Sequence, residues 1–204
     1  MFKWVSRLFN RRVNLPAPSK PATAKPIFVD GALVDIEIHD LEGFDDDQRK
    51  FFVEAAKLQL EVLSSQEFKD QFLGMKATEL NGKMMEEIYN LILSGKDKYN
   101  EIVDNDIDIM WGLFGNERFA SRTIGYTYPN ILKVFTNRYY FRQWMKSKNG
   151  KADLAGHIMH ESMHNYGFDH NRIKSTSLVY KTGDLISALG KKAINGQKLT
   201  PILK

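Results

Sequence analysis

The chain has 204 residues, of which 43% are hydrophobic and 26% charged, and its formal net charge is +4. This length allows one domain with extensions or two small domains, and no apolar run reaches the roughly 18 residues that a membrane-spanning helix needs. The chain contains no cysteine, which excludes disulfides, thiolate nucleophiles and cysteine-based zinc sites.

The charge is distributed unevenly along the chain. Residues 1–26 carry six basic residues and no acid, and residues 172–204 carry seven basic residues and one acid, so residues 27–171 carry a net charge of −8. A nucleic-acid-binding domain would present a basic face on its folded body, so we expect no nucleic-acid partner. The two basic ends are either solubilising tails or contacts for an acidic partner or an anionic membrane surface.

Residues 1–12 place their apolar side chains near one face of a helix and most of their basic ones off that face. This pattern is typical of an interfacial amphipathic helix or of a peptide that docks on a protein. Arg7 interrupts the apolar stretch and no small-residue cleavage site follows it, which does not fit a signal peptide. We therefore expect a cytoplasmic or particle-associated protein rather than a secreted one.

Four of the six prolines fall in residues 13–26, and this composition is typical of a semi-extended linker. Residues 27–204 are expected to form the folded domain. Within it, residues 33–40 alternate apolar and polar side chains, which predicts a half-buried strand with His39 on its polar face. We interpret His39 as an ordinary residue of that face.

Helical periodicity predicts a helix over residues 46–63, with acids in its first turn, and a shorter one over residues 65–74. A further helix is expected from Asn81, as its N-cap, to Ser94. The following segments predict a buried strand, two strands around a turn at Pro129 and Asn130, and an aromatic-rich helix or loop: residues 105–114, 123–128, 131–136 and 138–148. This order indicates a mixed α/β (α+β) domain with its sheet packed on helices.

The segment from residue 157 to residue 170 holds four of the five histidines. It contains H-E-x-x-H-x-x-G-x-x-H between His160 and His170, on a helix predicted over residues 152–166. Two histidines four positions apart leave one helix face one turn apart, so His160 and His164 can reach one zinc ion at about 2.0–2.1 Å.

The rest of the motif completes a catalytic type of metal site. Gly167 can take the left-handed conformation that ends a helix, after which His170 can supply a third nitrogen. Three protein ligands leave the fourth zinc position open to water, which is typical of catalytic sites. Glu161 lies about 100° round the helix from His160, so it can act as a general base toward that water.

Neighbouring residues of the motif have plainer interpretations. His157 shares the helix face of His160 and His164, and we interpret it as a packed or exposed histidine, with a place beside the ligands as the alternative. Asp169 is a weaker candidate than His170, because imidazole is the better zinc ligand. Core contacts are expected for the other large side chains of the segment: Met159, Met163, Tyr166 and Phe168.

This motif on a late helix resembles that of the metzincin clan of zinc metallopeptidases. The resemblance implies a metzincin-like zincin domain, a three-histidine site for one catalytic Zn²⁺, a glutamate general base and hydrolysis of peptide bonds. It also implies an edge strand above the cleft that pairs with an extended substrate. The local candidate for that strand is the segment from Thr123 to Thr127.

The chain departs from the metzincin pattern downstream of the third histidine, where those enzymes place a methionine-containing turn. No methionine follows Met163. The segment from Thr176 to Tyr180 resembles that turn, with Leu178 in the place of the methionine, a swap that costs little in many cores. Tyr180 falls where some metzincin groups keep a tyrosine, which implies that it binds zinc at rest or donates to the oxyanion.

The function expected from these features is that of a zinc-dependent endopeptidase acting on peptide or protein substrates. An alternative belongs to another class: a non-catalytic assembly or anchoring protein, such as a particle component, on a zinc-stabilised metzincin-like scaffold. In that case residues 1–26 would be the working part, in contact with a membrane surface or a protein.

Overall fold

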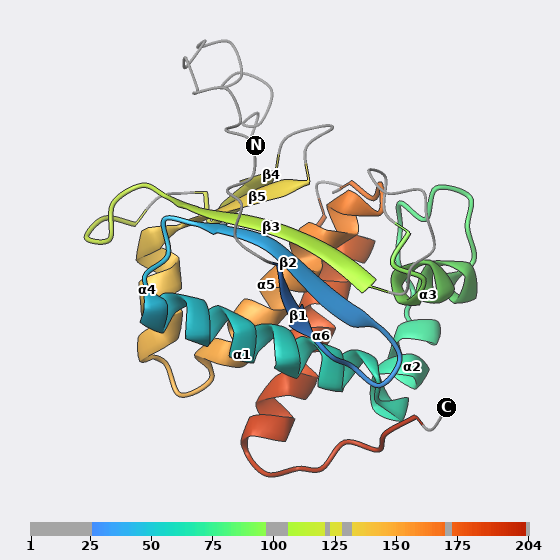
Figure 1. The fold of residues 1–204 in the computed structure, drawn as a ribbon. Helices are drawn as coiled ribbons and strands as arrows, with labels where there is room; N and C mark the ends of the chain where they lie inside the picture. Colours follow the sequence, from blue (N-terminus) through green and yellow to red (C-terminus); the bar gives the residue numbers. More distant parts are fainter. Residues whose placement is uncertain (1–25, 97–105, 121–122, 128–131, 170–172, 203–204) are drawn as a thin grey trace, which may run out of the picture.

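A computed structural model of the chain describes residues 26–96, 106–120, 123–127, 132–169 and 173–202. Within these residues the chain forms a mixed α/β fold with a five-stranded sheet and six helices (Figure 1). The predicted amphipathic segment 1–12, nearly all of the linker 13–26, and His170 lie outside the described residues.

The sheet has the order β1-β2-β3-β5-β4. Its strands are β1 Ile27–Val29, β2 Asp35–Glu42, β3 Asp106–Phe114, β4 Gly125–Thr127 and β5 Lys133–Asn137. The central strands β2, β3 and β5 are parallel, whereas β1 and β4 pair antiparallel with their neighbours at the two ends of this order. Strand β4 is therefore an edge strand in the described part of the chain.

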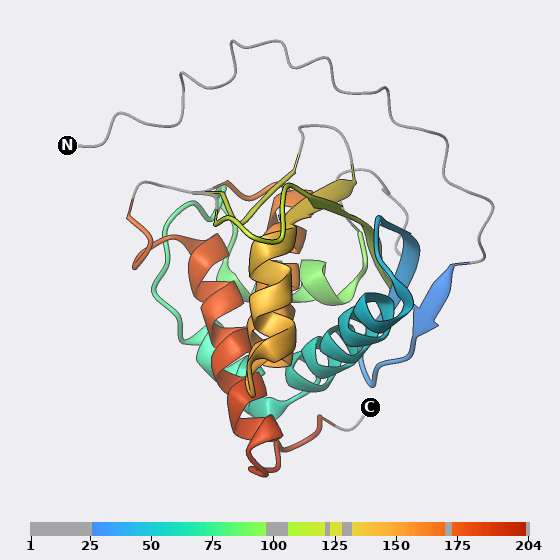
Figure 2. The same cartoon turned by 90° about the vertical axis from the view of Figure 1, so that its left-hand side faces the viewer.

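The helices are α1 Asp46–Leu63, α2 Gln66–Leu73, α3 Met85–Leu93, α4 Arg138–Lys146, α5 Gly150–Asn165 and α6 Leu178–Ile194. They lie on one side of the sheet, and no helix of the described residues covers the opposite face, which we call the outer face (Figures 1 and 2). None of these helices is both long enough and apolar enough to cross a membrane.

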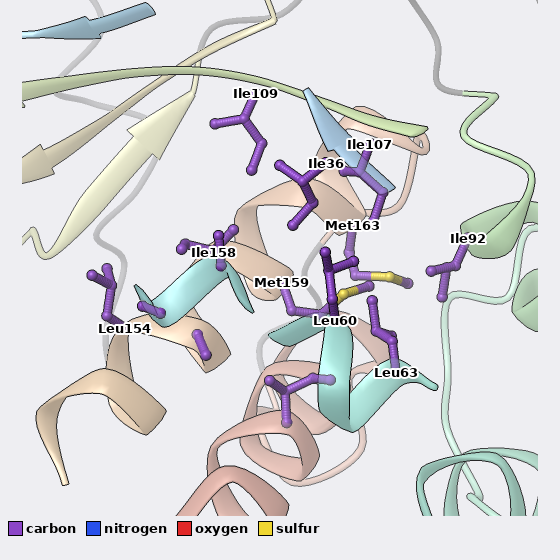
Figure 3. Close-up of a cluster of buried hydrophobic side chains, with 14 of the residues drawn as sticks. Ile36, Leu60, Leu63, Ile92, Ile107, Ile109, Leu154, Ile158, Met159 and Met163 are labelled. Atoms are coloured by element: carbon purple, nitrogen blue, oxygen red, sulfur yellow. The ribbon is translucent and has the colours of Figure 1, made fainter. Parts of the chain in front are cut away.

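The core lies between the sheet and helices α1 and α5. Alternate residues of β2 and β3 point toward the helices because successive side chains of a strand face opposite sides. Figure 3 shows these side chains meeting apolar residues of the two helices, all of them buried: Ile36, Ile107, Ile109, Leu60, Leu63, Ile158, Met159 and Met163. Helix α5 is thus held by the core along one side.

Most predicted elements are confirmed. Helix α1 spans the predicted residues 46–63, and it begins with a capping box in which Asp45 and Gln48 bond each other's backbone N–H groups, as expected for acids and amides at a helix start. The predicted strand at 105–114 and the metal-motif helix also form, as β3 and α5, and the segment at 138–148, expected as a helix or loop, forms helix α4.

The predicted N-cap at Asn81 is wrong. Helix α3 begins at Met85, after the N-cap residue Met84, and Asn81 instead adopts a left-handed conformation with φ of 52°. Asparagine tolerates this conformation better than most residues. Its side-chain amide donates a hydrogen bond of 3.0 Å to the carbonyl of Gly167, so it ties this loop to the end of α5 instead of capping a helix.

Candidate metal centre on helix α5

His160 and His164 project from one face of α5, one turn apart. Their ring centroids are 5.5 Å apart and the ring planes are nearly perpendicular, at 83°. The opposite side of the same turns is buried, with Met159 and Met163 inaccessible to solvent. Packing of the apolar side therefore fixes the direction in which the two imidazoles point.

A Schellman motif ends α5. Gly167 has φ of +88°, Phe168 N donates to Met163 O at 3.0 Å, and Gly167 N donates to His164 O at 3.0 Å. Both Phe168 and Met163 are buried, which supplies the apolar contact that accompanies this motif. The expected role of Gly167 in ending the helix is confirmed.

The same turn fixes the tautomer of His164. Its Nδ1 lies 2.7 Å from the carbonyl oxygen of Phe168, and since a carbonyl can only accept, Nδ1 carries the proton. The Nε2 atom of the neutral ring then carries the lone pair. A backbone carbonyl on one ring nitrogen is the usual arrangement for a histidine whose other nitrogen binds a metal.

Tyr180 lies beside these histidines. Its ring centroid is 4.7 Å from that of His160, and Lys174 Nζ lies 4.9 Å from the centre of the tyrosine ring. The sequence predicted a turn over residues 176–180, but the turn ends before Ser177 and helix α6 begins at Leu178. Tyr180 is therefore held on the first turn of a helix, and Leu178 is fully buried.

Helices α5 and α6 can bring the rings of His160 and Tyr180 together because Gly156 and Gly183 face each other where the helices cross. A Cβ atom built on Gly183 would lie 2.7 Å from the carbonyl oxygen of Gly156 and 3.0 Å from Cβ of His160. Side chains at these positions would force the helices apart.

Glu161 lies on the buried side of α5, next to the face that carries His160 and His164. Only 4% of the residue is exposed, and desolvation raises the pKa of its carboxyl group to about 8. Its Oε1 atom is 3.8 Å from Nδ1 of His157 and would be 3.0 Å from a Cβ atom on Gly125 of β4. The edge strand thus passes directly over the carboxylate.

His157 is packed, as one of the sequence interpretations expected. Its Nε2 lies 2.9 Å from Oγ1 of Thr136, which accepts a hydrogen bond of 2.8 Å from Trp111 Nε1. The rings of Trp111 and Trp144 pack on the imidazole at 5.8 and 5.2 Å, and burial lowers its pKa to about 3. His157 is therefore a neutral ring between β5 and Glu161.

The arrangement of the described residues fits a zinc ion. The imidazoles of His160 and His164 share one face of α5, and a backbone carbonyl accepts the Nδ1 proton of His164. The buried carboxylate of Glu161 directly follows His160 in the chain. His170, the third predicted ligand, lies outside the described residues. The segment from Thr123 to Thr127, which the resemblance implies above the cleft, contains Gly125, and Gly125 lies against Glu161. The sequence did not indicate Thr136 as a neighbour of the site, because it belongs to no recognisable motif.

Comparisons with protein-family models, curated proteins and solved structures find no match to this chain. The chemistry of the site must therefore be inferred from its own residues.

Proposed function

We propose that this chain is a zinc-dependent peptidase with a metzincin-like fold, in which His160, His164 and His170 hold the metal. The observation that carries the proposal is the arrangement on α5. His160 and His164 lie on one face, the carbonyl of Phe168 holds Nδ1 of His164, and a buried carboxylate follows His160 in the chain.

When bound, zinc supplies a Lewis acid that polarises a carbonyl and lowers the pKa of water toward 7. Glu161 is the residue that moves the proton: it takes one from the attacking water and returns it to the leaving amine. Its place directly after His160 in the chain, on the buried side of α5, keeps the carboxylate close to the histidine face.

Tyr180 is the candidate for stabilising charge that develops on the substrate carbonyl. A phenol that donates to an oxyanion contributes only when that charge forms. Its place on the first turn of α6 holds the ring against His160, within the neighbourhood of the two described ligands.

An extended substrate would pair with strand β4 by adding a strand to the sheet. Strand β4 lies at the end of the strand order, next to β5, and its first residue, Gly125, lies against His157 and Glu161. A peptide bonded to this edge would run past the carboxylate in both directions, which suits an endopeptidase.

The decisive variant is Glu161→Gln. We expect it to keep bound zinc, because none of the proposed ligands changes, and to lose about 10²–10⁴-fold in turnover, the usual range for a general base. Cleavage of an unstructured protein would be followed together with zinc content by elemental analysis. Undiminished hydrolysis by this variant would remove Glu161 from the mechanism.

Metal dependence is tested separately with His164→Ala. The wild-type protein should contain one equivalent of zinc at this site and lose cleavage with a chelator, and the variant should lose both. A control substitution on an exposed face of α6, Lys192→Ala, should change neither. Zinc binding without any cleavage would favour the assembly or anchoring function instead.

A further inference from the structure

Three candidate metal ligands lie together on the outer face of the sheet, away from the histidines of α5. Glu37 and His39 are two positions apart on β2, and Asp108 of β3 is the register partner of Glu37. His39 Nε2 lies 2.5 Å from Asp108 Oδ1, and His39 Nδ1 lies 3.6 Å from Glu37 Oε1. One ligand atom from each residue lies within 4.8 Å of the other two.

A β-bulge turns His39 toward these acids. The register of β2 on β3 shifts between Ile38 and Asp40, so His39 is the extra residue. Bulges often re-aim a side chain at a functional position. Here two consecutive polar residues contact different partners. Asp40 pairs with Lys133 of β5 at 3.0 Å, whereas His39 contacts Asp108 of β3.

The electrostatic environment differs between the two ends of this face. Lys133 bonds both Asp40 and Glu42, so a permanent cation offsets the acids at that end. Between Glu37 and Asp108 the imidazole of His39 takes the corresponding position, and this ring is positively charged only when it is protonated. The two carboxylates that flank this imidazole create a negative field, which favours a divalent cation at this place.

We propose that Glu37, His39 and Asp108 form a second divalent-metal site, for a transition ion such as Zn²⁺ or Mn²⁺. The metal replaces the proton shared by His39 and Asp108, and small side-chain rotations bring the three ligand atoms to the separations that one ion requires. Their exposed fractions are 33% for His39, 20% for Glu37 and 10% for Asp108, so the remaining positions of the ion are open to water.

The ligand set decides the class of ion. Mg²⁺ and Ca²⁺ prefer shells made only of oxygen, whereas one imidazole with two carboxylates suits zinc, manganese or iron. Ligation joins β2 to β3 beside the bulge, where the regular ladder is interrupted. Bound metal is therefore expected to stabilise the sheet, by an amount that rises with the logarithm of the free-ion concentration relative to the dissociation constant.

The test separates this site from the one on α5, on which it does not depend. The variant H160A/H164A lacks two ligands of the α5 site, and titration with Zn²⁺ by calorimetry should still show one equivalent bound. Adding D108N should weaken that binding about tenfold or more. Loss of an outer-shell partner already weakens metal binding by this much, and loss of a direct ligand should weaken it at least as much. Adding E42Q instead should leave it unchanged, because Glu42 pairs with Lys133 on the same face.

A second measurement uses the wild-type chain and requires no ligand variant. Substoichiometric Mn²⁺ should broaden the NMR signals of the His39 ring and of the Glu37 and Asp108 amides, and binding should weaken from pH 7.5 to pH 5.5 as protons compete. Absence of a bound equivalent in H160A/H164A, or equal affinity in the D108N and E42Q backgrounds, would overturn the proposal. Folding of each variant is checked by circular dichroism.

Discussion

The imidazole of His39 lies between two carboxylates, and this arrangement couples its protonation to folding. Since the hydrogen bond to Asp108 raises the folded pKa, His39 contributes stability that is fully present below its unfolded pKa of about 6.5. That contribution is lost as the pH rises through the higher folded pKa.

Substitution of His39 by Gln should therefore lower the free energy of unfolding more at pH 5.5 than at pH 9. Urea unfolding in the presence of a chelator measures the difference without a metal contribution. Lys83→Gln, at an exposed lysine, serves as a charge-matched control whose effect should not vary over this range. A His39→Gln effect of the same size at both pH values would show that protonation of His39 is not coupled to folding.

Some single-residue assignments could be made from the sequence and others could not. The spacing of His160 and His164 determines that they share a face, because helix geometry is periodic. The packing of His157 against Thr136 and Trp111 depends on how β3, β5 and α5 come together, and no local pattern encodes that. The grouping of His39 with Asp108 similarly depends on residues 69 positions apart.

Helices α5 and α6 cross at a glycine contact, and this crossing sets the distance between the ligand face and Tyr180. Gly156 and Gly183 each lack the Cβ that would strike the other helix. Glycine lowers intrinsic helix propensity by about 1 kcal/mol relative to alanine, so its presence inside α6 is offset by close packing. Sequence patterns do not predict the helix over residues 178–194, within which Gly183 and Gly190 weaken the helical signal.

Gly183→Ala should separate the two helices, since its Cβ would lie 2.7 Å from a backbone oxygen. We expect a loss of about 1–3 kcal/mol in the free energy of unfolding, typical of overpacking, and a weaker affinity for zinc because His160 must shift. Chemical denaturation and metal titration measure the two effects. Lys192→Ala on the exposed side of α6 should stay within about 0.5 kcal/mol of the wild type, and an equal effect of both variants would contradict the crossing.

Across the whole molecule, the C-terminal segment returns to the junction between α1 and α2. Gln66 N donates to Thr200 O at 2.8 Å, Ile202 N donates to Ser64 O at 2.8 Å, and Thr200 also bonds the Glu67 carboxylate. The last described residues thus bind elements that lie more than 130 positions earlier in the chain.

Truncation after residue 197 removes these bonds. The two backbone bonds, at about 0.5–1.5 kcal/mol each, give an expected loss of about 1–3 kcal/mol and a melting temperature lower by about 2–4 °C per kcal/mol. Thermal unfolding by circular dichroism measures the shift. Thr200→Val, which removes only the hydroxyl bond to Glu67, should lower the melting temperature less than the truncation; an unchanged value for the truncated chain would show that the return segment does not stabilise the fold.

At this scale the sequence predicts a sheet packed on helices, because strand and helix periodicities alternate along the chain. The order of the strands in the sheet is not encoded locally. It follows from long-range pairing, such as that of β2 with β3 across more than 60 intervening residues, which depends on the assembled core.

The carbonyl that holds Nδ1 of His164 belongs to the main chain of residue 168. No single substitution can delete a backbone oxygen, so genetic variation at position 168 can alter the buried side chain while the acceptor persists. The tautomer of His164 is accordingly buffered against mutation, and only changes that move the turn itself, at Gly167 or nearby, can reach it. Tolerance of other large apolar side chains at the buried residue 168, with no tolerance at residue 167, is the pattern that such buffering would leave in a saturation library.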